Sequence, residues 1–237
     1  MKKTFALKPL ALSLTVAAAS VATVAPATVQ AGVSANVGLV STYIYRGVQQ
    51  TADASASAGL DYENESGIYA GVWGADVGGG TAGLEYDVYA GWAGEFEGVS
   101  LGLGLTTYNY TGTFDTSYKE YNLSVGYGPV SIAYANGSWE DAADDGKDAA
   151  YTDLNISAGY EGFSATYGIY QTKDSDVAET AGASSYIDNK YLMVGYSMEL
   201  TKGLEGSVTY VKSDKEDKSV KDSNDLVFGL TYLLDIM

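Results

Sequence analysis

Most of the chain after residue 31 alternates, with a period of two, between apolar residues and small or polar residues. In 54–63, for example, alanine, leucine and tyrosine occupy every second position, and serine, glycine, Asp61 and Glu63 occupy the positions between them. Successive side chains of a β-strand point to opposite faces, so this pattern predicts strands with one apolar face and one small or polar face. We expect twelve strands, within 33–46, 54–63, 68–77, 84–93, 99–106, 120–127, 130–134, 154–160, 163–169, 192–196, 204–210 and 226–232.

Composition argues against helices as the alternative to these strands. The chain has 29 glycines, each of which would cost about 1 kcal/mol in a helix interior. Its many tyrosine, valine and threonine residues favour a pleated surface. We therefore predict an all-β fold, in which the orientation of 68–77 stays open because that segment is apolar on both faces.

The connections between the expected strands alternate between short and long. The short turns are 64–66, 94–98, 128–129, 161–162 and 199–203, and the long segments are 47–53, 77–83, 110–118, 136–150, 171–189 and 212–224. Soluble sandwiches and lipocalin-like barrels have no reason to sort loop length so strictly. Outer-membrane barrels do, with short periplasmic turns, long outer loops and an even number of strands. The pattern predicts an antiparallel transmembrane β-barrel of about twelve strands.

The chemistry of the two strand faces supports this prediction. The second face is mostly glycine, serine, threonine and asparagine instead of the lysine and glutamate common on soluble sheets. Aromatic residues of the apolar face lie near the strand ends, where two aromatic girdles would meet the membrane interfaces. The expected girdle residues are Tyr45, Tyr62, Tyr86, Trp92, Tyr121, Tyr127, Tyr134, Tyr160, Tyr196, Tyr210 and Tyr232. The alternative is the general preference of strands for tyrosine.

Residues 1–31 have the order of a secretory signal peptide. Lys2, Lys3 and Lys8 precede an uncharged stretch over 10–25, and small residues before Ala31 offer a cleavage site. We expect 1–31 to be removed and 32–237 to form the barrel, exported to the outer membrane of a Gram-negative bacterium. An N-terminal membrane anchor is the weaker alternative, because the apolar run is short and contains serine and threonine.

Charge and missing residue types exclude several functions. The formal charge of −17 is opposite to that of a nucleic-acid-binding protein, which needs a basic patch. The chain has no histidine and no cysteine, which removes Ser-His and thiolate catalysis and the usual zinc ligands. We expect no enzyme activity, no cofactor and no dedicated metal site, and we interpret the acidic loop segments 140–148, 174–176 and 214–217 as solvated charge.

Several segments resemble the TorF-type porin family of bacterial outer membranes. The resemblance is carried by Ser41-Thr-Tyr-Ile-Tyr-Arg-Gly47, by Glu85-Tyr-Asp-Val-Tyr-Ala-Gly-Trp92 and by Thr107-Tyr-Asn-Tyr110, and is close over 41–128. It implies a small outer-membrane barrel that forms a pore and has no catalytic residues. Two positions depart from the family pattern: Thr111 stands where proline is common, and the last residue is Met237 where such barrels usually end on an aromatic residue.

Charged residues on the inward phase are the candidates for lining a pore. They are Arg46, Asp61, Glu63, Glu85, Asp87, Glu120, Asp153 and Glu205. Rings of carboxylates in a narrow bore favour cations over anions. The alternative is that these carboxylates bond to tyrosine, serine and asparagine and fill the lumen, although the many inward glycines and serines favour an open bore. We expect Arg46 to face Asp61 or Glu63 across neighbouring strands.

The sequence therefore predicts a diffusion channel for small hydrophilic solutes that weakly prefers cations. The alternative is a closed structural or adhesive barrel that acts through its outer loops. The partners that we expect are outer-membrane lipids and lipopolysaccharide, periplasmic chaperones, the barrel-assembly machinery and the permeating solutes, and no nucleic acid.

Overall fold

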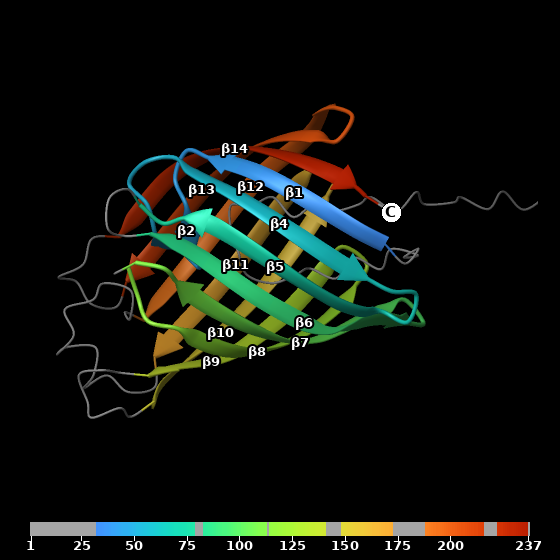
Figure 1. Ribbon diagram of the computed structural model, residues 1–237, viewed down its shortest axis with the longest axis horizontal. Coiled ribbons are helices and arrows are strands. Elements are labelled where there is room, and N and C mark those ends of the chain that lie inside the picture. The colour runs from blue at the N-terminus through green and yellow to red at the C-terminus, as the bar shows by residue number, and fades with distance from the viewer. Residues whose placement is uncertain are drawn as a thin grey trace, which may run out of the picture.

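The computed structural model describes residues 32–78, 83–112, 114–140, 148–172, 188–215 and 222–236. Within these ranges, twelve antiparallel strands form one closed barrel, and two further short strands form a separate hairpin (Figure 1). The barrel strands are β1 (Gly32–Val40), β4 (Ser55–Glu63), β5 (Ile68–Asp76), β6 (Leu84–Phe96), β7 (Val99–Tyr110), β8 (Tyr118–Tyr127), β9 (Val130–Glu140), β10 (Asp148–Tyr160), β11 (Phe163–Thr172), β12 (Asn189–Thr201), β13 (Leu204–Lys215) and β14 (Ser223–Asp235). The predicted fold class is confirmed. No helix of the described residues is long and apolar enough to cross a membrane.

The barrel closes between the first and the last strand. Strand β1 pairs with β14 on one side, from Ser34 opposite Asp235 to Val40 opposite Gly229, and with β4 on the other. Every other barrel strand pairs with its neighbours in the sequence. Closure leaves no open sheet edge, which is the condition for placing strands in lipid.

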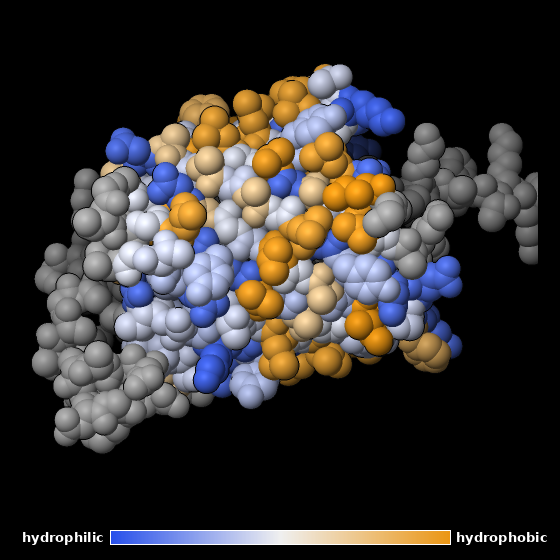
Figure 2. Space-filling view, in the orientation of Figure 1, coloured by the Kyte–Doolittle hydropathy of each residue, from blue (hydrophilic) through white to orange (hydrophobic). Residues whose placement is uncertain are grey.

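The apolar phase of the strands faces outward. Its leucines, valines and tyrosines are exposed, and Figure 2 shows hydrophobic residues gathered across the middle of the barrel, with a hydrophilic surface nearer the long loops. The orientation of β5, which the sequence left open, is now defined. Ile68 and Val72 are exposed on the outside, whereas Tyr69 and Trp73 point inward and Ala75 is buried.

Short turns lie at one end of the barrel, called the short-turn end, and longer connections lie at the other, the long-loop end (Figure 1). Two of the short turns, Glu97-Gly98 and Glu161-Gly162, have positive φ at both residues. Positive φ at both central positions is the mark of the type I′ turn, whose twist matches that of the flanking strands. The predicted division into short and long connections is confirmed for the described residues. The acidic loop tips lie mostly outside those residues.

One predicted strand is wrong. The alternation over 33–46 predicts a single strand, but β1 ends at Val40 and the chain then turns into the barrel. Residues 41–54 carry β2 (Ile44–Tyr45) and β3 (Val48–Gln49), and Tyr43 and Ile44 are buried. The physical reason is that nine residues already complete the strand, and burial of two large apolar side chains against the inner wall is more favourable than their exposure.

The outward position of Leu123 gives a first prediction. This side chain lies on β8 between Leu103 and Tyr134 of the neighbouring strands and is 57% exposed. If this face meets lipid, Leu123→Arg lowers the free energy of unfolding by about 2–4 kcal/mol. Urea titration of the barrel in lipid vesicles measures the change, with Leu123→Ala as the control. Equal stability of the arginine and alanine variants would contradict a lipid-facing position.

Candidate functional site: the lumen and its internal hairpin

The lumen consists of two halves that differ in content. Toward the long-loop end, inward side chains are large and buried, including Tyr108, Trp139 and Tyr151. Toward the short-turn end, the inward positions are mostly glycine, serine, threonine and asparagine and are partly exposed. The long-loop half of the described barrel is therefore filled, and the short-turn half is lined by small residues.

The long-loop half is filled by a hairpin over 44–49, which we call the lumen hairpin. Ile44 pairs with Gln49 and Tyr45 with Val48, so that Arg46 and Gly47 form a two-residue turn. Both turn residues have positive φ, 47° for Arg46 and 76° for Gly47, as in the type I′ turns at the other end. A Cβ at Gly47 would lie 2.5 Å from Cβ of Tyr191 on β12. The turn is therefore packed directly against the inner wall.

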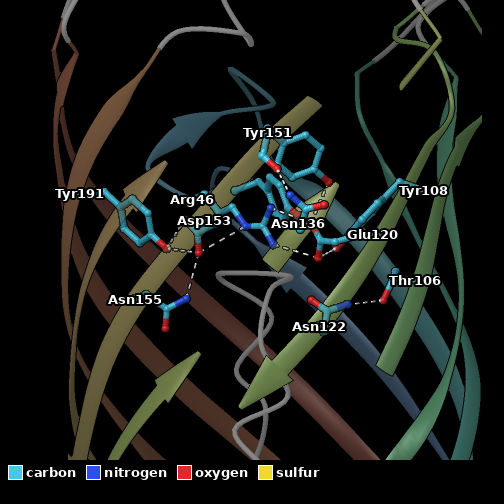
Figure 3. A network of polar contacts seen from close by, with 11 residues as sticks. Arg46, Thr106, Tyr108, Glu120, Asn122, Asn136, Tyr151, Asp153, Asn155 and Tyr191 are labelled. Carbon is cyan, nitrogen blue, oxygen red and sulfur yellow. Dashed lines mark hydrogen bonds and ion pairs between the residues drawn. The ribbon is translucent and has the colours of Figure 1, made fainter. Parts of the chain in front are cut away.

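Arg46 is the only arginine of the chain, and it lies at the centre of a polar network (Figure 3). Its Nη1 and Nη2 donate to the two carboxylate oxygens of Glu120, at 2.8 and 3.0 Å. Its Nε lies 3.7 Å from Oδ2 of Asp153. All three side chains are almost fully buried. A bidentate arginine–carboxylate pair is stronger and more directional than a single hydrogen bond.

Tyrosines surround this ion pair. The hydroxyls of Tyr108 and Tyr151 donate to Glu120 at 3.0 and 2.7 Å, and Tyr191 and Asn155 donate to Asp153 at 3.0 and 2.9 Å. The guanidinium carbon also lies 4.7 Å from the ring centre of Tyr45 and 5.7 Å from that of Tyr151. Carboxylates, hydroxyls and ring faces thus surround one cation, and all of them except the Tyr45 ring belong to the barrel wall.

Burial and nearby charges keep Arg46 charged and Tyr43 protonated, as their contacts require. Burial alone would lower the pKa of Arg46, but Glu120, Tyr45 and Asp153 raise it, and the net pKa is well above the usual value. Burial, and then the charge of Glu85, raise the pKa of Tyr43 well above its usual value. The Tyr43 hydroxyl therefore remains a donor, and it donates to Glu85 at 3.2 Å.

Four inward carboxyl side chains are buried in the long-loop half of the lumen, which also contains Arg46. Glu85, Asp87, Glu120 and Asp153 are all buried, and Arg46 pairs with the last two. Among the described residues, no group donates a hydrogen bond to Oδ1 of Asp87. The long-loop half therefore holds acidic side chains that Arg46 does not pair with.

The remaining carboxylates lie toward the short-turn end. Asp61 accepts hydrogen bonds from Tyr89 and from Asn36, the latter at 3.4 Å. Asp61, Glu63 and Glu205 are each partly exposed on the inward phase of their strands. These side chains are therefore accessible inside the short-turn half of the barrel.

Glycines let several inward tyrosines lie flat on the wall. A Cβ at Gly71 would lie 2.5 Å from the Tyr89 ring, and one at Gly91 would lie 2.4 Å from the Tyr69 hydroxyl. Real Cβ atoms do not approach so closely, so only glycine allows these ring positions. The rings therefore cover the wall instead of crossing the short-turn half of the lumen.

The structure corrects two further predictions. Arg46 points inward as expected, but it contacts Glu120 and Asp153 instead of Asp61 or Glu63, because it lies on the lumen hairpin and not on a barrel strand. Tyr45 is not a girdle residue, since its hydroxyl donates to Tyr108 inside the lumen at 3.1 Å. The other expected girdle residues are Tyr62, Tyr86, Trp92, Tyr121, Tyr127, Tyr134, Tyr160, Tyr196, Tyr210 and Tyr232, and all of them lie on the outward phase. Their contact with a membrane interface stays a prediction.

The inward tyrosines that hold the network were missed as site residues. Tyr151 and Asp153 are two positions apart and share the inward phase of β10, which begins six residues earlier than predicted. Extending the period of two toward the long-loop end would have placed Tyr151 on the same face. A cavity of about 50 Å³ remains beside the hairpin, lined in part by Arg46, Glu85, Tyr110 and Tyr170. Within the described ranges, no three side chains of histidine, cysteine, aspartate or glutamate are placed to hold a metal ion.

The closed barrel of twelve antiparallel strands is similar to solved porin structures. The KdgM porin has the same fold, with a TM-score of 0.52 at 10% sequence identity over 84% of this chain and 98% of KdgM. A KdgM porin in complex with disordered oligogalacturonate matches with a TM-score of 0.50 at 9% identity, over 85% of this chain and 98% of that one. A membrane protein from work on in-meso crystallization matches with a TM-score of 0.53 at 12% identity, over 87% of this chain and 84% of the other.

Residues 24–230 match the model of a family described as "Bacterial protein of unknown function (Gcw_chp)", and the chain belongs to this family. None of the curated protein sequences matches the chain significantly. The porin part of the resemblance found in the sequence agrees with the fold of these neighbours, whereas the TorF-type name stays a prediction.

Proposed function

We propose that the protein is an outer-membrane channel for the passive diffusion of small hydrophilic solutes, with a weak preference for cations. The observation that carries this proposal is the short-turn half of the lumen, where small inward residues and flat tyrosine rings leave the wall residues partly exposed. The porin-type fold of KdgM supports the same proposal. The proposal assigns the protein no catalytic role, and it includes residues 1–31 as a signal peptide that directs export.

The preference for cations follows from the inward charge. Asp61, Glu63 and Glu205 lie on the inward phase of the short-turn half and are partly exposed. Carboxylates in a narrow bore lower the energy of a cation and raise that of an anion. Oligogalacturonate, which is present in a KdgM complex, carries a carboxylate on each sugar. The lumen of this chain suits neutral and cationic solutes better than such an acidic one.

The lumen hairpin favours a second candidate function. In the described conformation it fills the long-loop half, so a solute can pass only when the hairpin moves. A barrel whose hairpin never leaves would be a non-conducting structural or adhesive protein that acts through its outer loops. The two functions differ in whether the purified barrel conducts ions.

Planar-bilayer recording in a KCl gradient tests the proposed channel. We expect discrete conductance steps and a reversal potential that indicates preference for K⁺ over Cl⁻. The combined variant Asp61→Asn, Glu63→Gln and Glu205→Gln reduces that preference by about threefold, because three carboxylates no longer attract cations. Glu161→Gln, in an exposed turn at the same end, serves as the control and leaves the preference unchanged.

Two outcomes contradict parts of this proposal. A bilayer that stays silent, with wild-type protein and with a variant lacking the lumen hairpin, would favour the structural or adhesive barrel. In that case, deletion of outer loops would abolish surface binding and leave folding intact. A reversal potential that favours Cl⁻ would contradict the cation preference alone.

A further inference from the structure

We infer that the inner wall around Glu120 and Asp153 is a binding site for guanidinium compounds, and that Arg46 occupies this site as a tethered ligand. The site consists of Glu120, Asp153, Tyr108 and Tyr151, and we call it the wall site. Its role in transport rests on the proposed channel, because a soluble guanidinium compound that replaces Arg46 would release the lumen hairpin. Binding itself does not depend on conduction.

The wall site and its occupant come from different parts of the fold. Tyr108, Glu120, Tyr151 and Asp153 lie on barrel strands β7, β8 and β10, whose positions are set by the closed ladder. Arg46 lies on a hairpin that pairs only with itself among the described strands. The side chains that hold the cation are thus rigidly placed, whereas the cation belongs to a segment that the ladder does not hold.

The wall site matches the chemistry of a guanidinium group. Glu120 accepts from both Nη atoms of Arg46, which is a geometry that a planar fork provides and an ammonium ion does not. The carboxylate is oriented by the hydroxyls of Tyr108 and Tyr151. The ring face of Tyr151 adds the cation–π attraction that guanidinium groups favour.

Arg46 does not make all the contacts that the wall site offers to a guanidinium group, so a free ligand can bind there more favourably. Its Nε is buried, lies 3.7 Å from Asp153 and makes no hydrogen bond with the described residues. Arg46 also has a positive φ of 47°, a conformation that is unfavourable for a residue with a Cβ. A free guanidinium compound has neither the tether nor the backbone strain, so it can adjust to donate to both carboxylates.

The tether sets the concentration at which a free ligand competes. A group on a short segment next to its site has an effective concentration on the order of millimolar. A free guanidinium compound therefore binds weakly to the wild-type protein and more tightly once the arginine side chain is removed. This difference makes the inference testable.

The experiment uses ethylguanidinium and the variant Arg46→Ala in detergent, with binding measured by calorimetry. We expect the variant to bind ethylguanidinium at least about tenfold more tightly than the wild type does. Tetramethylammonium, which has no N–H donors, binds more weakly than ethylguanidinium. Adding Glu120→Gln to Arg46→Ala removes the preference for ethylguanidinium, because the bidentate acceptor is lost. If Arg46→Ala does not fold, a variant in which a Gly-Ser linker replaces 44–49 opens the same wall site.

The outcomes separate this inference from the proposed channel. Equal affinity for the two cations, or binding that survives Glu120→Gln, overturns the wall site even if the protein conducts. Specific ethylguanidinium binding in a protein that never conducts overturns the channel and supports the wall site. If both hold, ethylguanidinium at concentrations that saturate Arg46→Ala reduces the current through that variant, and an unchanged current overturns the location of the site in the conduction path.

Discussion

A variant in which six Gly and Ser residues replace the lumen hairpin 44–49 is expected to conduct about tenfold more than the wild type, because its removal opens the long-loop half of a lumen that is wider than the filled interior of an eight-stranded barrel. In the wild type, Tyr43, Ile44 and Arg46 are each at most 1% exposed inside the barrel. Their contacts with the wall occupy the long-loop half of the lumen. Single-channel recording in symmetric KCl measures the difference.

The control for this variant is Gln49→Gly. Gln49 belongs to the same hairpin, but its side chain is exposed. Removing this side chain therefore leaves the packed face of the hairpin and the conductance unchanged. An equal conductance of the wild type and the linker variant would mean that the hairpin does not limit the path. The hairpin would then have only a structural role.

Glu120→Gln is expected to have the largest effect on stability. Glu120 holds Arg46 in a bidentate ion pair and accepts from Tyr108 and Tyr151 as well. The amide keeps one oxygen and loses the charge, so the guanidinium stays buried with a weaker partner. Removal of one partner of a buried ion pair costs about 3–5 kcal/mol.

Unfolding in urea, followed by the gel shift between folded and unfolded barrel, measures this loss. Glu95→Gln is the matched control, since Glu95 is exposed on β6 near a short turn, and a change of less than about 0.5 kcal/mol is expected there. A loss of stability that is no larger for Glu120→Gln than for Glu95→Gln would show that the ion pair does not stabilise the barrel.

The barrel could be predicted from the sequence because one physical rule governs all its strands. A closed sheet with lipid on one side and a small-residue lumen on the other requires a period of two in every strand. The position of Leu123 between inward Asn122 and Ser124 is typical. The orientation of β5 was not evident from the sequence because Tyr69 and Trp73 make its inward face apolar as well. Only its pairing with β4 and β6 defines which face points outward.

The lumen hairpin could not be predicted, because alternation does not distinguish a barrel strand from a strand inside the barrel. Tyr43 and Tyr45 continue the phase of Val37 and Leu39, so 33–46 reads as one strand. Two local features argued against a single strand. The segment 33–46 has fourteen residues, which is more than the about 9–11 residues of a strand that crosses a membrane. In addition, an arginine followed by a glycine permits a tight turn at its end. The ion pair with Glu120 joins residues 74 positions apart, a contact that depends on how the hairpin folds into the closed barrel.

A reversible lock on the lumen hairpin tests most directly whether this hairpin closes a channel. The chain has no cysteine, and a Cβ at Gly47 would lie 3.1 Å from Cβ of Ser213, slightly closer than the separation in a disulfide. A Cβ at residue 47 would also lie 2.5 Å from Cβ of Tyr191, so the double variant Gly47→Cys and Ser213→Cys can lock the turn to β13 only after the turn shifts away from β12. The single variant Gly47→Cys controls for this shift and for strain at the positive φ of residue 47, and the single variant Ser213→Cys controls for the loss of the serine. We predict that single-channel conductance of the double variant is suppressed when it is oxidised and returns when it is reduced. Equal conductance in the two states would contradict the account.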